Sequence, residues 1–109
     1  MKFSVLLFSA IASIPCFAGQ WSEATPVTKI FPHSTLNEKG TVYFSFAQVI
    51  NPGSCNQSGQ VALLKSNQLE SEIYSLLLSA FMADKKVTYY AEGCDALGYP
   101  VMLHAAVSQ

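Results

Sequence analysis

Two of the three cysteines, Cys55 and Cys94, are the residues of this chain with the clearest covalent chemistry. The third, Cys16, lies in an apolar N-terminal segment that has the features of an export signal. No C-x-x-C spacing is present, so a thioredoxin-like redox site is not expected. In an oxidising compartment the remaining pair predicts one structural disulfide. It would close a loop of about 40 residues and stabilise the fold by about 4 kcal/mol.

The histidines and acids do not form a catalytic or metal-binding pattern. His33 and His104 have no acidic or thiolate cluster near them in the sequence. Neither G-x-S-x-G nor H-E-x-x-H occurs. Glu92 and Asp95 flank Cys94 in a turn, where carboxylates are usually solvated. We therefore expect a protein that is not an enzyme and that needs no metal or cofactor.

Aromatic residues are the better candidates for a binding site. They are Trp21, Tyr43, Tyr89, Tyr90 and Tyr99, each on or near an expected strand or turn. Aromatic faces beside hydroxyl and amide groups suit sugar rings, whose C–H faces stack while their hydroxyls form hydrogen bonds. Tyrosine also favours the half-buried surface of ordinary strands. From the residues alone, both interpretations stay open.

The first 18 residues have the three parts of a secretory signal peptide. A lysine at position 2 precedes an apolar run from Phe3 to Ile14, and small residues follow near Ala18. The run is shorter than the roughly 20 residues of a membrane span. We expect a signal peptide at 1–18, a single secreted or periplasmic domain at 19–109, and no membrane span. An N-terminal helix of the core is the alternative.

Charge excludes one class of partner. All six basic residues are lysines, and removing residues 1–18 leaves five of them against seven acidic residues, a net charge of −2. The chain has no arginine and no run of basic residues. Such a chain is poorly suited to contact a phosphate backbone, so nucleic acid is not an expected partner.

Periodicity predicts five strands and one helix. The strands are expected at 21–31, 40–49, 60–64, 87–91 and 100–107, and the helix at 67–84. Val42, Phe44 and Phe46 share one strand face, while Asn67 and Glu70 have the spacing of a helix capping box. The order β-β-β-α-β-β is that of a mostly β, five-stranded OB-fold-like barrel with one α-helix. An α+β sheet with the helix on one face is the alternative.

The C-terminal half resembles a known family. The matching pieces are the apolar helix segment 76–83, the turn and strand at 85–90, and Tyr99-Pro100-Val101, which opens the last strand. Near the N-terminus, Trp21-Ser22-Glu23-Ala24 is similar to an aromatic-Ser-acid stretch before the first strand. These features resemble the B subunits of AB5-type bacterial toxins, in the subtilase-cytotoxin and pertussis-like group. Small exported proteins of unknown role with the same layout also look similar.

The resemblance implies a homopentamer of OB-fold protomers that binds cell-surface glycans on one face and a catalytic A subunit on the other. The family's serine contacts sialic acid, which makes Ser22 a candidate. With it we expect Trp21, Tyr43 and Tyr89 to be glycan-binding residues. The helices of such a ring line a central pore. Ser71, Ser75, Ser79 and Met82 form the small, uncharged stripe expected to face the other protomers.

The sequence thus predicts an exported, non-enzymatic binding domain that acts as a glycan-binding, toxin-like B subunit. The alternative is a monomeric periplasmic protein that binds or inhibits another exported protein. Size and partner distinguish the two, because the first forms an oligomer that binds glycan and the second forms a one-to-one protein complex.

Overall fold

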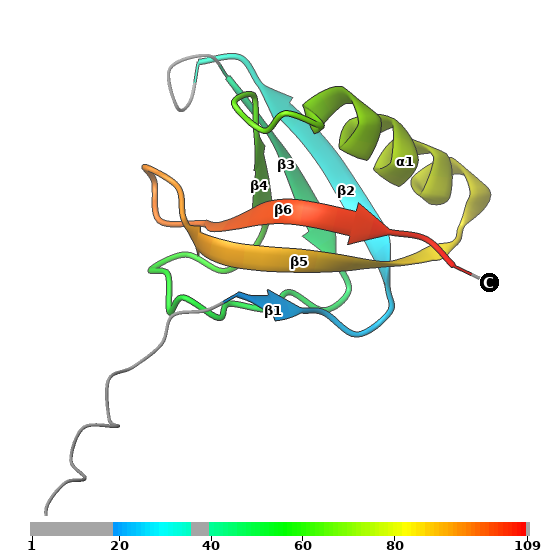
Figure 1. Ribbon diagram of the computed structural model, residues 1–109, viewed down its shortest axis with the longest axis horizontal. Helices are drawn as coiled ribbons and strands as arrows, with labels where there is room; N and C mark the ends of the chain where they lie inside the picture. The colour runs from blue at the N-terminus through cyan, green and yellow to red at the C-terminus, as the bar shows by residue number, and fades with distance from the viewer. Residues whose placement is uncertain (1–18, 36–39, 109) are drawn as a thin grey trace, which may run out of the picture.

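A computed structural model describes residues 19–35 and 40–108 of the chain (Figure 1). The expected signal peptide at 1–18 lies outside the described residues, as does most of the turn expected before position 40. Within the described part, no helix has both the length and the apolar character needed to cross a membrane.

The described chain is mostly β with one α-helix, as predicted. In order, the elements are β1 Gln20–Trp21, β2 Thr25–His33, β3 Thr41–Phe46, β4 Val61–Leu64, α1 Glu70–Ala83, β5 Lys86–Cys94 and β6 Pro100–Ala106. The expected first strand is divided in two, since β1 is a separate strand of two residues. The predicted order β-β-β-α-β-β therefore becomes β-β-β-β-α-β-β.

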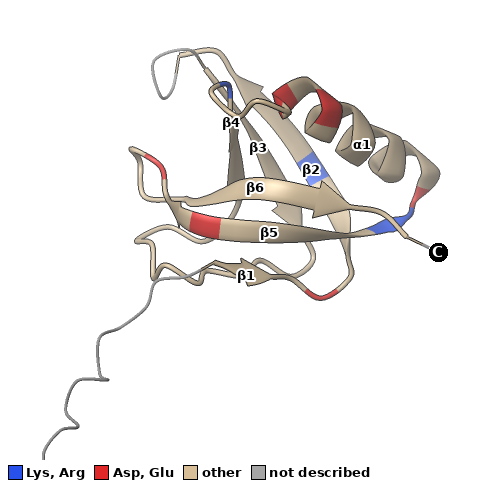
Figure 2. Cartoon of the chain, in the orientation of Figure 1, with Lys and Arg blue, Asp and Glu red and all other residues tan. Residues whose placement is uncertain are grey.

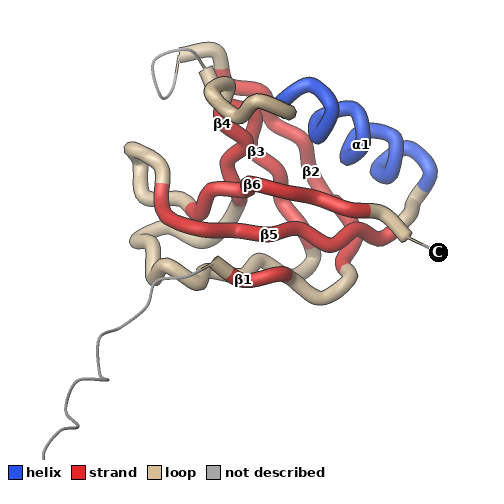
Figure 3. Tube along the Cα trace, in the orientation of Figure 1, coloured by secondary structure: helices blue, strands red, loops and turns tan. Residues whose placement is uncertain are grey.

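The strands form one six-stranded mixed sheet in which neighbours along the chain are not always neighbours in space. The pairings run β5–β2–β3–β4–β6, and β6 pairs again with β5. The β4–β6 pairing is parallel and rests on Ala62 and Val101, while the other pairings are antiparallel. β1 adds to β5 outside this series of pairings. Figure 3 shows the helix packed along one side of the strands.

Alternation along the strands places apolar side chains in the core. Val42, Phe44 and Phe46 of β3 all lie in the main hydrophobic cluster, which confirms the predicted shared face. The helix contributes Ile73 and Leu77, which have the i, i+4 spacing of a buried stripe. Because each element has one apolar face, the helix and the strands bury these faces against one another.

The helix is shorter than predicted at its N-terminal end. It begins at Glu70, after the N-cap residue Leu69. Asn67 is not the N-cap of a capping box. Its Oδ1 accepts a hydrogen bond from the Leu69 N–H at 2.8 Å, and its backbone oxygen accepts one from the Glu70 N–H at 3.0 Å. The preference of asparagine for such local bonds makes it a turn residue that precedes the helix.

The predicted disulfide is present. Cys55, in the segment between β3 and β4, is bonded to Cys94 at the end of β5, with the two Cα atoms 5.7 Å apart. Asn51 holds the same segment, because its side chain accepts a bond from the Cys55 N–H at 2.8 Å and donates one to the Cys55 oxygen at 2.9 Å. The disulfide thus fixes the segment after β3 to the turn between β5 and β6.

Charged residues are sparse and scattered over the described surface (Figure 2). Lys29 lies on β2, Lys65 in the turn after β4, and Lys85 and Lys86 where α1 passes into β5. Lys85 and Lys86 follow the helix, and its last turn contains no basic residue. Lys65 pairs with Glu70 at 3.4 Å.

Candidate functional site

Three aromatic side chains lie side by side on the sheet formed by β1, β5 and β6. Trp21 of β1 is opposite Tyr90 of β5, and Tyr90 is in turn opposite His104 of β6. Side chains directly opposite each other on neighbouring strands are on the same face and in contact range. We call Trp21, Tyr90 and His104 the aromatic cluster.

The rings of the aromatic cluster form a compact triangle. Their centroids are 5.6 Å apart for Trp21 and Tyr90, 5.3 Å for Tyr90 and His104, and 6.2 Å for Trp21 and His104. The Trp21 and His104 planes are within 25° of parallel, and Tyr90 is inclined to both. Trp21 is 49% exposed and His104 is also exposed. The cluster therefore offers aromatic surface to solvent.

Gly19 and Glu92 set the position of the Tyr90 ring. A Cβ at Gly19 would come within 2.5 Å of the Tyr90 ring, so any other residue here would require the ring to shift. The Tyr90 hydroxyl donates a hydrogen bond to Glu92 Oε1 at 3.2 Å. Desolvation raises the pKa of Tyr90, and its hydrogen bond to the Glu92 carboxylate and that group's charge raise it further. The phenol thus remains neutral well above neutral pH.

Ser22, a predicted glycan contact, is buried and holds β1 in place. Its Oγ accepts a hydrogen bond from the Tyr89 N–H at 3.0 Å, and its own N–H donates to the Tyr89 oxygen at 2.7 Å. Both backbone groups of Tyr89 that face β1 are therefore satisfied by one residue. In this arrangement Ser22 positions the neighbouring Trp21 and does not itself present a surface.

Tyr89 and Tyr43, two further predicted glycan contacts, are fully buried. The Tyr89 ring stacks on Phe46 at 4.2 Å, and its hydroxyl accepts a bond from the Ile50 N–H at 3.0 Å and donates one to the Gln48 oxygen at 3.2 Å. Burial raises the pKa of Tyr89. The Tyr43 hydroxyl donates to Asp95 Oδ2 at 2.7 Å. Of the four predicted glycan residues, only Trp21 is exposed, and only Trp21 enters the proposal below.

Tyr90 was among the aromatic candidates but not among the predicted glycan-binding residues, and His104 was not a candidate for binding. The signal that could have found Tyr90 is strand alternation: Val87, Tyr89 and Ala91 are buried in one row, which places Tyr90 on the opposite face. His104 could be found only from the register of β6 on β5, which depends on residues distant in the sequence.

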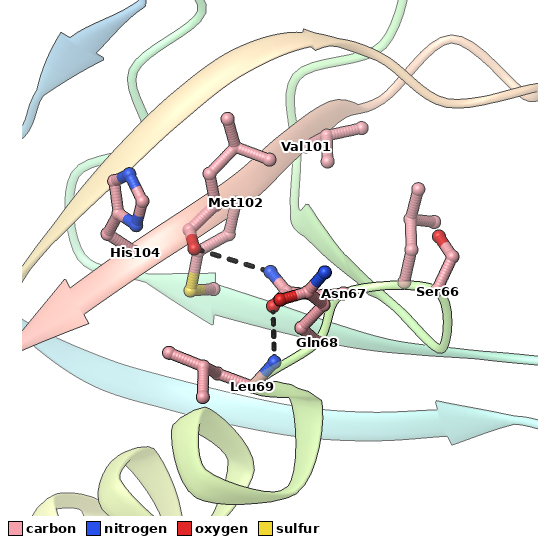
Figure 4. A pocket seen from close by; sticks show the side chains of 9 residues that line it. Ser66, Asn67, Gln68, Leu69, Val101, Met102 and His104 are labelled. Atoms are coloured by element: carbon pink, nitrogen blue, oxygen red, sulfur yellow. Dashed lines mark hydrogen bonds between the residues drawn. The ribbon is translucent and has the colours of Figure 1, made fainter.

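A pocket of about 390 Å³ adjoins the aromatic cluster at the far edge of β6 (Figure 4). Its lining comes from two segments, 64–69 and 101–104, and includes His104. Asn67 lies between β6 and the start of α1, where its Nδ2 donates to the Leu103 oxygen at 3.3 Å. His104 thus belongs to both the cluster and the pocket.

The helix stripe predicted for oligomer contacts is on the outer surface. Ser71, Ser75, Ser79 and Met82 are all exposed, and Met82 is 75% exposed. A shallow hollow lies along the three serines and is also lined by Glu72 and Leu76. The stripe is free to contact another molecule, and its role in an oligomer stays a prediction.

The described residues contain no group of three or more His, Cys, Asp and Glu side chains that could hold a metal ion. The two histidines lie in different surroundings. His33 contacts Phe31 edge-on at 5.4 Å, and its Nδ1 accepts a bond from the Thr35 N–H at 3.5 Å, whereas His104 belongs to the aromatic cluster.

No family model matches the chain, and neither a curated protein nor a solved structure matches it. The functional argument therefore depends on the geometry of the molecule and on the partial resemblance in its sequence.

Proposed function

We propose that this chain is an exported, non-enzymatic binding domain that recognises glycans through the aromatic cluster. The observation that carries the proposal is the half-exposed Trp21 ring, held beside Tyr90 and His104 on three paired strands. Sugar rings stack their C–H faces on such surfaces. Tyr90 and His104 stand on the long paired strands β5 and β6, which reduces the entropy lost at these two rings when a ligand binds.

The charge beside the cluster favours a neutral sugar. The Glu92 carboxylate contacts Tyr90 and can accept hydrogen bonds from sugar hydroxyls. An anionic sugar would be repelled by the same carboxylate. The resemblance pointed to sialic acid at Ser22, but the Oγ of that serine is buried and already bonded to Tyr89. We therefore propose a neutral hexose or hexosamine as the contacted unit.

The fold we propose is an OB-fold. Five strands pair in a series that returns to its start, one parallel pairing is included, and the helix lies between the third and fourth of the five. β1 is then an addition at the N-terminus. OB-folds bind oligosaccharides as well as oligonucleotides. The lack of arginine and the net negative charge favour the carbohydrate.

We propose in addition that the domain assembles as a toxin-like B subunit, with the stripe Ser71, Ser75, Ser79 and Met82 facing neighbouring protomers. All four side chains are exposed, and none is charged. Small hydroxylated residues let helices approach closely. Light scattering of the mature, oxidised protein on a sizing column tests this. A pentamer supports the ring and the search for a catalytic A subunit, and a monomer overturns it.

Glycan binding itself is tested with an array of neutral and sialylated glycans. The mature protein is compared with Trp21→Ala and with Phe31→Ala, which removes an aromatic ring that is 38% exposed and lies outside the cluster. We expect the native protein and Phe31→Ala to bind neutral glycans, and Trp21→Ala to lose about tenfold or more in affinity. No binding by the native protein, or equal loss in both variants, overturns the proposal.

One observation favours the alternative of a monomeric protein that binds another exported protein. Leu78, Phe81 and Met82 are exposed together near the C-terminal end of α1. Exposed apolar residues on one helix face suit a protein contact. Two results together would replace the glycan proposal with this one. The protein would be a monomer in light scattering, and it would recover one stoichiometric partner from periplasmic extract that Phe81→Ser does not recover.

A further inference from the structure

The pocket beside His104 has a lining that differs in kind from the aromatic cluster. Its aliphatic residues are Leu64, Leu69, Val101, Met102 and Leu103. The pocket contains no Asp, Glu, Lys or Arg among its lining residues. At about 390 Å³ it is within the range of small-ligand pockets, roughly 300–1,000 Å³. The lining therefore favours an apolar group over a charged one.

The Asn67 amide is not available to a sugar, and the other polar residues of the lining are Ser66, Gln68 and His104. Asn67 uses its Nδ2 to donate to the Leu103 oxygen and its Oδ1 to accept from the Leu69 N–H (Figure 4). A sugar unit placed here would set part of its hydroxyls against the aliphatic side chains of the lining, and unpaired buried hydroxyls are costly. An alkyl group has no such cost and gains from the removal of its surface from water.

His104 joins the pocket to the aromatic cluster. Its ring is 5.3 Å from Tyr90 and 6.2 Å from Trp21, and the same residue lines the pocket. A ligand that covers the cluster therefore has the pocket at its edge. Leu69, which is 53% exposed, forms the part of the aliphatic lining most open to solvent.

We propose that the pocket is the second part of the glycan site, and that it takes a short apolar aglycone while the sugar stacks on the aromatic cluster. This inference rests on the proposed glycan function. The ligand class is a neutral glycoside with an alkyl substituent at its reducing end. The cluster supplies recognition of the sugar, and the pocket selects glycosides over free sugars.

The test measures the affinity of the mature protein for methyl, butyl and octyl glycosides of the same neutral sugar, below the micelle concentration of the octyl compound. Affinity should rise by up to about fourfold for each buried methylene and level off when the pocket is full. The diagnostic variant is Leu69→Ser. Serine is a good N-cap residue, and the native Leu69 side chain makes no capping bond, so this variant should fold.

We expect Leu69→Ser to bind the methyl glycoside as the native protein does and to lose about tenfold for the octyl glycoside. The matched control is Leu97→Ser, which changes a leucine that is 46% exposed in the turn between β5 and β6 and should keep the full octyl advantage. Equal affinity for all three glycosides overturns the pocket proposal and leaves the glycan function in place. An octyl advantage that survives in Leu69→Ser also overturns it, because the chain would then lie elsewhere.

If the proposed glycan function itself is wrong, the same measurements give different results. Binding of no glycoside overturns both proposals. Binding of the octyl compound alone, lost in Leu69→Ser but unchanged in Trp21→Ala, overturns the two-part site and the glycan function together, because the alkyl chain would bind without help from the sugar.

Discussion

Tyr89 and Tyr90 are adjacent in β5 and belong to two different parts of the molecule. Tyr89 is fully buried, stacks on Phe46 and bonds two backbone groups with its hydroxyl. Tyr90 is on the outer face, between Trp21 and His104, and its hydroxyl contacts the side chain of Glu92. Strand geometry alone separates them, because successive side chains point to opposite faces.

The difference shows how one residue type serves two purposes. The inner tyrosine joins the core to the segment after β3 through Gln48 and Ile50, so it stabilises the fold. The outer tyrosine contributes aromatic surface that the fold does not need for its core. The glycan site that we propose depends on this aromatic surface. Each prediction below changes one of the two tyrosines, or a residue that holds them, and compares the results.

The largest expected effect is on stability. Tyr89→Ala should lower the free energy of unfolding by about 3–5 kcal/mol, because it leaves a cavity beside Phe46 and removes two hydrogen bonds. Tyr90→Ala should lower it by about 1 kcal/mol or less. Urea unfolding followed by circular dichroism measures both. Equal losses would show that the outer ring is also structural.

Removing only the hydroxyl groups should give the same contrast between the two tyrosines, with smaller losses in the free energy of unfolding. Tyr89→Phe leaves the part-buried Ile50 N–H without its acceptor and should lower the free energy of unfolding by about 1–3 kcal/mol. Tyr90→Phe loses a hydrogen bond on the outer surface and should cost about 0.5 kcal/mol or less. The same unfolding experiment applies. A loss in Tyr90→Phe that matches the loss in Tyr89→Phe would contradict the assignment.

Ser22 connects the two tyrosines, because it bonds the backbone of Tyr89 and directly follows Trp21, whose ring contacts Tyr90. Ser22→Ala removes the acceptor of the Tyr89 N–H and should cost about 1 kcal/mol. It should also loosen Trp21, which shifts tryptophan fluorescence to longer wavelength and weakens glycan binding. Ser45→Ala, at a hydroxyl in a long 3.4 Å bond to the Gly59 oxygen, is the control and should change neither. Unchanged fluorescence in Ser22→Ala would show that β1 does not need this serine.

The smallest effect is a change in titration. Burial raises the pKa of Tyr89, and desolvation with the Glu92 carboxylate raises that of Tyr90. A tyrosine whose pKa is higher in the folded state than its unfolded value of about 10 stabilises the folded state below pH 10. This stabilisation is lost as the pH rises through the folded-state pKa. The free energy of unfolding should therefore fall above pH 10. In ultraviolet titration, Tyr89→Phe and Tyr90→Phe should each remove a phenol that ionises late.

The main features of the fold could be predicted from the sequence because they depend on local patterns. The alternation of Val42, Phe44 and Phe46 predicted a core strand, and the buried helix residues Ile73 and Leu77 have the local i, i+4 spacing of an amphipathic helix. The pairing of Cys55 with Cys94 followed from their number and the expected export. In each case the relevant residues are close in sequence or few in number.

The candidate site was harder to predict because it depends on pairing between distant segments. Ser22 looks like a surface residue in its own sequence context, and it is buried because β5 lies against it. Tyr43 is buried because Tyr99 packs on it at 5.2 Å, and Asp95 accepts a hydrogen bond from its hydroxyl. Local periodicity does not contain this information, which comes from strand register.

The short strand β1 has a consequence for the order in which the molecule folds and opens. Its pairing brings Gln20 and Trp21 against Ala91 and Tyr90, at the opposite end of the described chain. Closing so long a loop costs entropy that two residues of pairing repay only in part. We expect β1 to dock last in folding and to detach first in native-state hydrogen exchange, while the core remains intact. Trp21, which belongs to the proposed glycan site, would then detach and rebind without unfolding of the domain.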